Sequence, residues 1–127
     1  MSFDVTVEMR DEGVYTVNPV GTLDSNTYLV FEENVTPLFV SSTKSLLFDM
    51  DELDYISSAG VRVVFKAIKA MSEHGGSIGM INLKPQIRKV FELINALPSI
   101  RVFKDIKEAD RYLDTMQKRE IEKQQER

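Results

Sequence analysis

The chain has 127 residues, 43% of them hydrophobic and 28% charged, which is typical of one folded globular domain rather than of a disordered chain. It has no cysteine, which excludes disulfides and thiol chemistry, and its single histidine cannot form a His-rich metal site. The net charge of -4 argues against a direct nucleic-acid partner, and no apolar stretch reaches the roughly 20 residues that span a bilayer. We therefore expect a cytoplasmic protein without a membrane span, whose partner is another protein.

The first forty residues predict a β-hairpin followed by a helix. Apolar and polar residues alternate over residues 3–9 and again over 14–20, and a turn sequence at 11–13 separates the two runs. Good helix-capping residues follow at 24–26, so a helix is predicted to begin there. Because proline disrupts a helix interior, this helix is predicted to end or kink just before Pro37.

The remainder alternates between strands and helices. A central buried strand is predicted at 44–50, a short strand at 77–83 and another at 100–103. Helices are predicted from the serine pair at 57–58 to Gly75, from Pro85 to Pro98, and over residues 106–116. This order predicts an α/β domain with a mixed β-sheet over residues 1–116, followed by a charged tail at 117–127, either a helical extension or disordered. The predicted core includes the aromatic residues Phe48, Phe65 and Phe91.

Few side chains suggest catalysis. A serine hydrolase has glycine two residues before its nucleophile, but Ile56 precedes Ser58 at that distance. The one candidate base, His74, falls at the far end of the helix that the serines begin, some 20 Å away. The acidic residues Asp49, Asp51, Glu52 and Asp54 suggest a magnesium site only weakly, and a solvated loop is the favoured interpretation. We therefore expect no catalytic residue, no metal and no cofactor.

The stretch LDYISSAGVRVV (residues 53–64) leaves two interpretations open for its serines. One serine can cap the helix by accepting a backbone N–H bond. Alternatively, the second is phosphorylated, because a helix N-terminus offers free N–H groups and a partial positive charge. The small residues Ala59 and Gly60 would leave an approaching kinase room, and the phosphate would join a spot predicted to be rimmed by Asp51, Glu52 and Asp54.

Four segments together resemble a STAS domain, the fold shared by anti-sigma-factor antagonists and the tails of sulphate transporters. They are Gly21-Thr22-Leu23-Asp24, the strand 46–50, the stretch 53–61, and Val90-Phe91-Glu92-Leu93. The resemblance implies a mixed sheet of four to five strands with helices packed mainly on one face. It also implies that Ser58 is the phosphoacceptor. Ser57 stands where the family has an aspartate and is a backup acceptor.

The resemblance further implies a partner switch that catalyses nothing itself. The unphosphorylated domain would bind an anti-sigma-factor serine kinase, which then releases its client regulator. Phosphorylation at Ser58 would block binding, and a metal-dependent serine phosphatase would restore it. The expected partner-binding residues lie on two loops and the adjoining helix: Asp24, Ser25, Asn26, Asp54, Tyr55, Ser57, Ala59, Gly60 and Arg62. The alternative is a STAS scaffold that is not phosphorylated, or a subunit of a transport complex.

Overall fold

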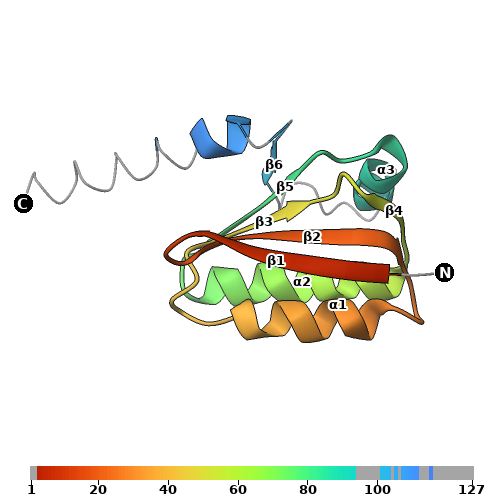
Figure 1. The fold of residues 1–127 in the computed structure, drawn as a ribbon, viewed down its shortest axis with the longest axis horizontal. Helices are drawn as coiled ribbons and strands as arrows, with labels where there is room; N and C mark the ends of the chain where they lie inside the picture. The colour runs from red at the N-terminus through yellow and green to blue at the C-terminus, as the bar shows by residue number, and fades with distance from the viewer. Residues whose placement is uncertain (1–2, 94–100, 104, 106, 112–114, 116–127) are drawn as a thin grey trace, which may run out of the picture.

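The computed structural model describes residues 3–93, 101–103, 105, 107–111 and 115. The elements are β1 (Phe3–Asp11), β2 (Val14–Leu23), α1 (Tyr28–Val35), a 3₁₀ turn (Thr36–Leu38), β3 (Ser45–Asp49), β4 (Leu53–Ile56), α2 (Ser58–Glu73), β5 (Ser77–Ile81), α3 (Pro85–Leu93) and β6 (Arg101–Phe103). This order, drawn in Figure 1, confirms the α/β class. The predicted helix end at Pro98, part of the predicted last helix and the whole tail at 117–127 lie outside the described residues.

The sheet is mixed, as predicted. Its main path runs β1-β2-β3-β5-β6, in which β1 and β2 are antiparallel and the other neighbours are parallel. The ten-residue β2 pairs with β3 near its start and with the short β4 near its end, where the register shifts at Gly21 and Thr22. Within the described residues the sheet therefore has six strands, because β4 branches from the main path.

The hairpin turn depends on Gly13. Its φ of 75° lies in the left-handed region, where glycine is favoured. A Cβ there would also lie 2.6 Å from the carbonyl oxygen of Ser42. The Gly13 carbonyl accepts the backbone N–H groups of Lys44 and Ser45 over 2.7 and 3.1 Å, so the turn fixes the chain where it enters β3.

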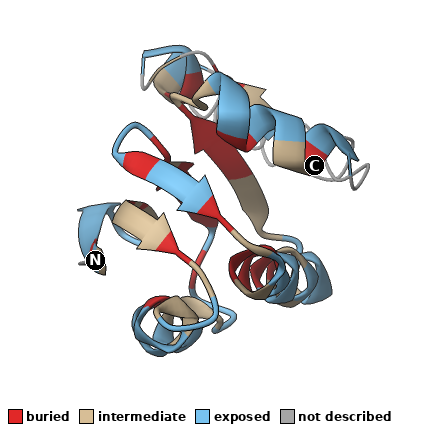
Figure 2. Ribbon diagram, turned by 90° about the vertical axis from the view of Figure 1, so that its right-hand side faces the viewer, coloured by how far each residue is buried: buried red, intermediate tan, exposed pale blue. Residues whose placement is uncertain are grey.

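Helices α1 and α2 lie side by side along one face of the sheet and enclose the main core (Figures 1 and 2). Alternate residues of β3 point to opposite faces, and Leu46 and Phe48 belong to this core. Phe31 of α1 packs against Phe48, with ring centroids 6.0 Å apart. Lys66 of α2 bonds to Glu32 of α1 over 2.6 Å at the rim.

The opposite face carries a smaller cluster: Leu47, Ile81, Phe103 and Ala109. Ala109 belongs to the helical residues 107–111, so this face too is partly covered by helix. The guanidinium of Arg10 at the end of β1 binds both carboxylate oxygens of Asp110 over 2.7 and 3.1 Å. This hydrogen-bonded pair raises the pKa of Arg10.

The first helix begins later than predicted. Residues 24–27 form a hydrogen-bonded turn, and α1 starts only at Tyr28, with Thr27 at its N-cap. In this turn the Asp24 carboxylate accepts the Asn26 N–H over 2.8 Å, and the Thr27 hydroxyl accepts the Asp24 N–H over 2.9 Å. Side chains that favour caps also favour such turns, which explains the error. The predicted break before Pro37 is confirmed, because α1 ends at Val35 and a 3₁₀ turn follows.

Candidate functional site

Two loops meet at one edge of the sheet. Because β2 and β4 are parallel, with Leu23 opposite Ile56, the chain leaves both strands at the same edge. The backbone N–H of Ser57 donates a hydrogen bond to the carbonyl oxygen of Leu23 over 2.8 Å. The loop that carries Asp24 therefore lies against the residues that open α2.

The two serines have different surroundings. Ser58 is the first residue of α2 and is exposed. Ser57 occupies the N-cap position, but its side chain forms no capping bond, and its Oγ is buried without a hydrogen-bond partner among the described residues. The interpretation that a serine hydroxyl caps this helix is therefore wrong. The same burial argues against Ser57 as a backup acceptor, because a kinase cannot reach its Oγ in this conformation.

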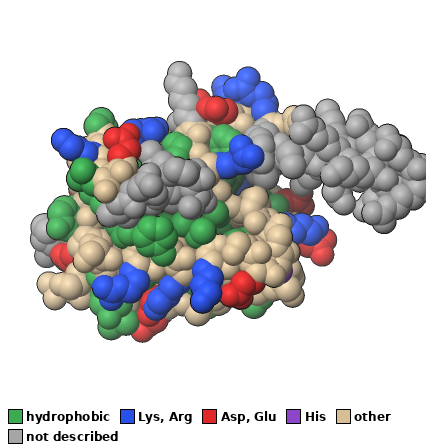
Figure 3. All heavy atoms as spheres, turned by 180° about the vertical axis from the view of Figure 1, so that it is seen from behind, with side chains coloured by type: hydrophobic (Ala, Val, Ile, Leu, Met, Phe, Trp, Pro, Cys, Tyr) green, Lys and Arg blue, Asp and Glu red, His purple; other side chains and the backbone are tan. Residues whose placement is uncertain are grey.

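Ser58 opens onto a groove of about 410 Å³, which is lined by Ser58, Val61, Arg62, Phe65 and Val90. The first four follow the i, i+3, i+4, i+7 spacing and share one face of α2, while Val90 comes from α3. Seen from behind the view of Figure 1, hydrophobic side chains gather across the middle of the molecule, with basic side chains below them (Figure 3).

The position of Phe65 differs from the prediction. It was expected in the core, yet it is 41% exposed and lines the groove. The buried face of α2 is instead made by Gly60, Val61, Val63, Val64, Ala67 and Met71. Apolar residues cover two adjoining faces of this helix, so spacing alone cannot tell which one meets the sheet. Tyr55 on β4 and Leu93 on α3 are also exposed apolar residues.

Gly60 is buried, which argues against the prediction that it contacts a partner directly. A Cβ at this position would lie 2.6 Å from Cγ of Leu23 and 2.9 Å from Cγ1 of Ile56. Glycine therefore lets the first turn of α2 approach the sheet closely. Ala59 is half-buried, and Arg62 is exposed.

The acidic rim predicted around Ser58 is wrong in part. Asp51 and Glu52 precede β4, whereas Ser58 follows it, so they lie at the other end of that strand. Asp54 and Tyr55 are exposed, and Asp54 bonds to Lys84 over 2.7 Å. In the neighbouring loop Asp24 is half-buried, and Ser25 and Asn26 are exposed.

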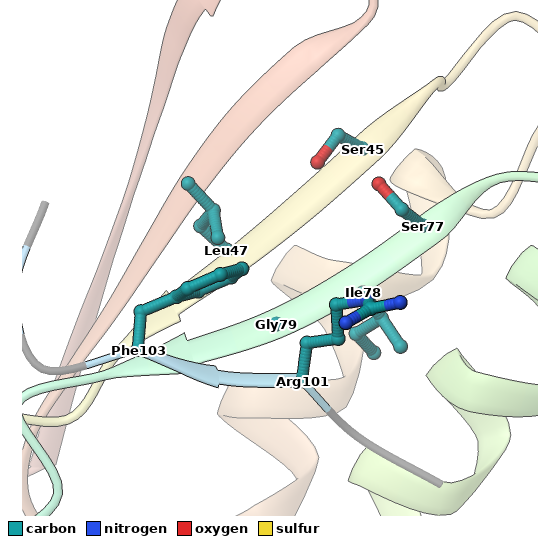
Figure 4. A pocket seen from close by; sticks show the side chains of 7 residues that line it. All are labelled: Ser45, Leu47, Ser77, Ile78, Gly79, Arg101 and Phe103. Carbon is teal, nitrogen blue, oxygen red and sulfur yellow. The ribbon is translucent and has the colours of Figure 1, made fainter. Parts of the chain in front are cut away.

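Other candidate sites are weaker. Ser58 and His74 lie at opposite ends of the 16-residue α2, about 20 Å apart, so they do not form a nucleophile–base pair. A cavity on the other side of the sheet, lined by Ser45, Leu47 and Phe103 among others (Figure 4), has a volume of only about 10 Å³, room for one water at most.

The described residues contain no cluster of three or more potential metal ligands. Within the same residues, no helix is long and apolar enough to cross a membrane.

These features define a mixed-sheet α/β domain that presents a serine and an apolar groove beside one sheet edge. The model of the STAS domain family matches residues 7–109, and the chain belongs to this family. The resemblance inferred from the four sequence segments is thus confirmed. Membership of this family supports the expectation that the chain is not an enzyme.

Known proteins with similar sequences carry antagonist names. The chain is 42% identical over 50 residues to BtrV of Bordetella bronchiseptica, named as an anti-sigma factor antagonist; the match covers 39% of this chain and 43% of BtrV, less than half of that protein. It is 23% identical over 93 residues to the anti-sigma-B factor antagonist of Staphylococcus aureus, covering 73% of this chain and 85% of the relative.

Solved structures share the fold. The unphosphorylated form of the anti-sigma factor antagonist SpoIIAA superimposes with a TM-score of 0.76 at 18% identity, over 87% of this chain and 97% of SpoIIAA. The phosphorylated form of SpoIIAA from Bacillus gives a TM-score of 0.70 at the same identity, over 86% of this chain and 99% of SpoIIAA. At this level of identity the likeness extends to the fold alone.

Proposed function

We propose that the chain is an anti-sigma-factor antagonist controlled by phosphorylation of Ser58. Unphosphorylated, it binds an anti-sigma-factor serine kinase, which then releases its client regulator. Because the kinase uses ATP, the proposal places the chain in the cytoplasm. The observation that carries the proposal is the exposure of Ser58 at the start of α2, on the edge of an apolar groove, next to a serine whose hydroxyl is buried.

The groove supplies the binding surface in this proposal. Its apolar part consists of Val61, Phe65 and Val90, and Tyr55 on β4 and Leu93 on α3 are further exposed apolar residues. Of these residues, Phe65, Tyr55 and Leu93 are exposed, and exposed apolar side chains are a feature of protein interaction sites. The adjoining loop with Asp24, Ser25 and Asn26 adds polar groups at the rim.

Phosphorylation changes the charge at the edge of this surface. Transfer forms a bond between Oγ of Ser58 and the γ-phosphorus of ATP, breaks the bond between the γ-phosphorus and the bridging oxygen, and releases ADP and the hydroxyl proton. A partner that covered Ser58 would then have to bury nearly two negative charges. A cost of about 1.4 kcal/mol weakens binding tenfold, and an unmatched buried charge costs more. Hydrolysis by a metal-dependent serine phosphatase would return the hydroxyl and release inorganic phosphate.

The test has a modification arm and a binding arm. We expect incubation of the full chain with ATP and each anti-sigma-factor serine kinase of the same organism to add one phosphate, measured by intact mass, and Ser58→Ala to abolish the addition. In the binding arm, Ser58→Asp weakens binding to that kinase at least tenfold, whereas Ser58→Ala retains it.

Ser41→Asp is the matched control for added charge. Ser41 is exposed and precedes β3, whereas Ser58 follows β4, so the two positions lie at opposite edges of the sheet. This variant should bind as wild type does. Absence of phosphate with every kinase, together with tight binding by Ser58→Asp, would contradict the proposal. That outcome would favour the alternative of an unphosphorylated scaffold or a subunit of a transport complex, since one fold can serve several functions.

A further inference from the structure

Ser58 and Arg62 lie one turn apart on the same face of α2, and both line the groove. Side chains separated by four residues on a helix are neighbours, with Cβ atoms about 5–6 Å apart. The long, flexible arginine side chain can therefore bring its guanidinium to a group attached to Oγ of Ser58. Both side chains are exposed, so neither needs a change in packing to meet the other.

Arg62 differs from Lys66 and Lys84, which both pair with carboxylates. Lys66, one turn further along α2, is paired with Glu32, and Lys84 is paired with Asp54. Arg62 forms no ion pair with any residue that the structure describes. It is thus a cation held at the edge of the groove without a counter-ion among these residues.

We infer that Arg62 is the intramolecular counter-ion of a phosphate on Ser58. The inference rests on the proposed function, because it assumes that Ser58 is modified. The guanidinium offers several N–H donors in a plane that matches two phosphate oxygens, which makes arginine well suited to the role. An anion placed four residues before a cation is also the favourable order on a helix, since it agrees with the helix dipole.

The carboxylates of Asp24 and Asp54 have other partners and do not compete with a phosphate on Ser58 for Arg62. Asp24, in the adjoining loop, accepts a hydrogen bond from the Asn26 N–H over 2.8 Å. Asp54, on β4, is paired with Lys84. Among the residues that line the groove, Arg62 is the one with a positive charge.

The pairing would give phosphorylation a second effect. Besides adding charge, it would draw the guanidinium of Arg62 toward Ser58 and hold it at the mouth of the groove that Phe65 and Val61 line. A partner could then no longer pair with the Arg62 guanidinium, and part of the apolar groove surface would be covered. Arg62 therefore acts as a positioning residue for the phosphate. This role is separate from any contact that Arg62 makes with a partner.

The experiment measures the phosphate directly, without a partner. Phosphoserine is placed at position 58 of the full chain by genetic-code expansion, and the second pKa of the phosphate is measured by ³¹P NMR titration. Arg62→Gln should raise this pKa by about 0.2–0.4 pH units, the size expected for an ion pair of this spacing. Arg62→Lys should give a smaller rise, because lysine keeps the charge but not the planar donor pair.

Lys66→Gln is the matched control, since it removes the same charge from the same helix at a residue outside the groove. It should leave the phosphate pKa within about 0.1 pH units of wild type. An unchanged pKa in Arg62→Gln, or an equal change in both glutamine variants, would overturn the inference. Circular dichroism verifies that each variant folds. Because the phosphoserine is installed directly, a failure of this test is distinct from a failure of the kinase to modify Ser58.

Discussion

Gly60 of α2 packs directly against Leu23 at the end of β2: a Cβ on Gly60 would lie 2.6 Å from Cγ of Leu23. The same end of β2 accepts the backbone N–H of Ser57 through its Leu23 carbonyl oxygen. The contact of Gly60 with Leu23 sets how closely α2 approaches the sheet. The hydrogen bond from Ser57 to Leu23 fixes the loop that precedes α2. Together they hold Ser58 at the edge of the groove.

Gly60→Ala is therefore expected to destabilise the protein. Alanine in place of glycine inside a helix normally stabilises by about 0.5–1 kcal/mol, whereas forcing atoms into a packed core costs about 1–3 kcal/mol. Leu23 is fully buried and has little room to move, so we expect a net loss of about 1 kcal/mol in the free energy of unfolding, measured by urea titration. The loss should shrink when the substitution is made in a Leu23→Ala background. A Gly60→Ala variant as stable as wild type would contradict the close contact.

The substitution Phe65→Ala tests whether Phe65 belongs to the groove or to the core. Because Phe65 is 41% exposed, its truncation should lower the free energy of unfolding by less than about 1.5 kcal/mol. The matched substitution Phe91→Ala removes a fully buried ring and should cost about 3–5 kcal/mol. The two values come from denaturant titrations under identical conditions. Equal losses would mean that Phe65 belongs to the core after all. Under the proposed function, Phe65→Ala should also weaken kinase binding.

The N-cap residues Ser57 and Thr27 are expected to respond differently to alanine. The Thr27 hydroxyl donates to the Thr22 carbonyl over 2.7 Å and accepts the Asp24 N–H over 2.9 Å, so Thr27→Ala should cost about 1–2 kcal/mol. The Ser57 hydroxyl has no partner among the described residues, so Ser57→Ala should change stability by less than about 0.5 kcal/mol. A serine that truly caps a helix typically contributes about 1 kcal/mol. A loss of that size on thermal unfolding of Ser57→Ala would show that the hydroxyl does cap α2.

The Arg10–Asp110 pair should make a small contribution that does not depend on pH near neutrality. Both side chains are partly exposed, at 30% and 45%, so a double-mutant cycle with Arg10→Met and Asp110→Asn should give a coupling of about 0.5 kcal/mol. The pair raises the pKa of Arg10, so the arginine contribution is present below the ordinary arginine pKa and is lost only at strongly alkaline pH. The coupling should therefore be the same at pH 6 and pH 9 and weaker in 1 M salt. A coupling of zero would mean that the pair does not hold residues 107–111 on the sheet.

Much of the fold could be predicted from local patterns. Alternating apolar residues identified the hairpin, the continuous run at 44–50 identified β3, and Pro37 marked the end of α1. These features depend on neighbours in the chain, because strand pleating, helix periodicity and the missing N–H of proline act over a few residues. The start of α1 was predicted too early because aspartate and asparagine serve turns as readily as helix caps.

The amino-acid sequence by itself determined the α/β class, the family resemblance and the placement of Ser58 at the start of a helix. Only the tertiary structure decided which hydroxyl is exposed, which face of α2 meets the sheet and which carboxylates lie near Ser58. These properties depend on contacts between residues far apart in the chain, such as Gly60 with Leu23 and Asp54 with Lys84. Burial results from such contacts, and no local pattern distinguishes the exposed Phe65 from the buried Phe91.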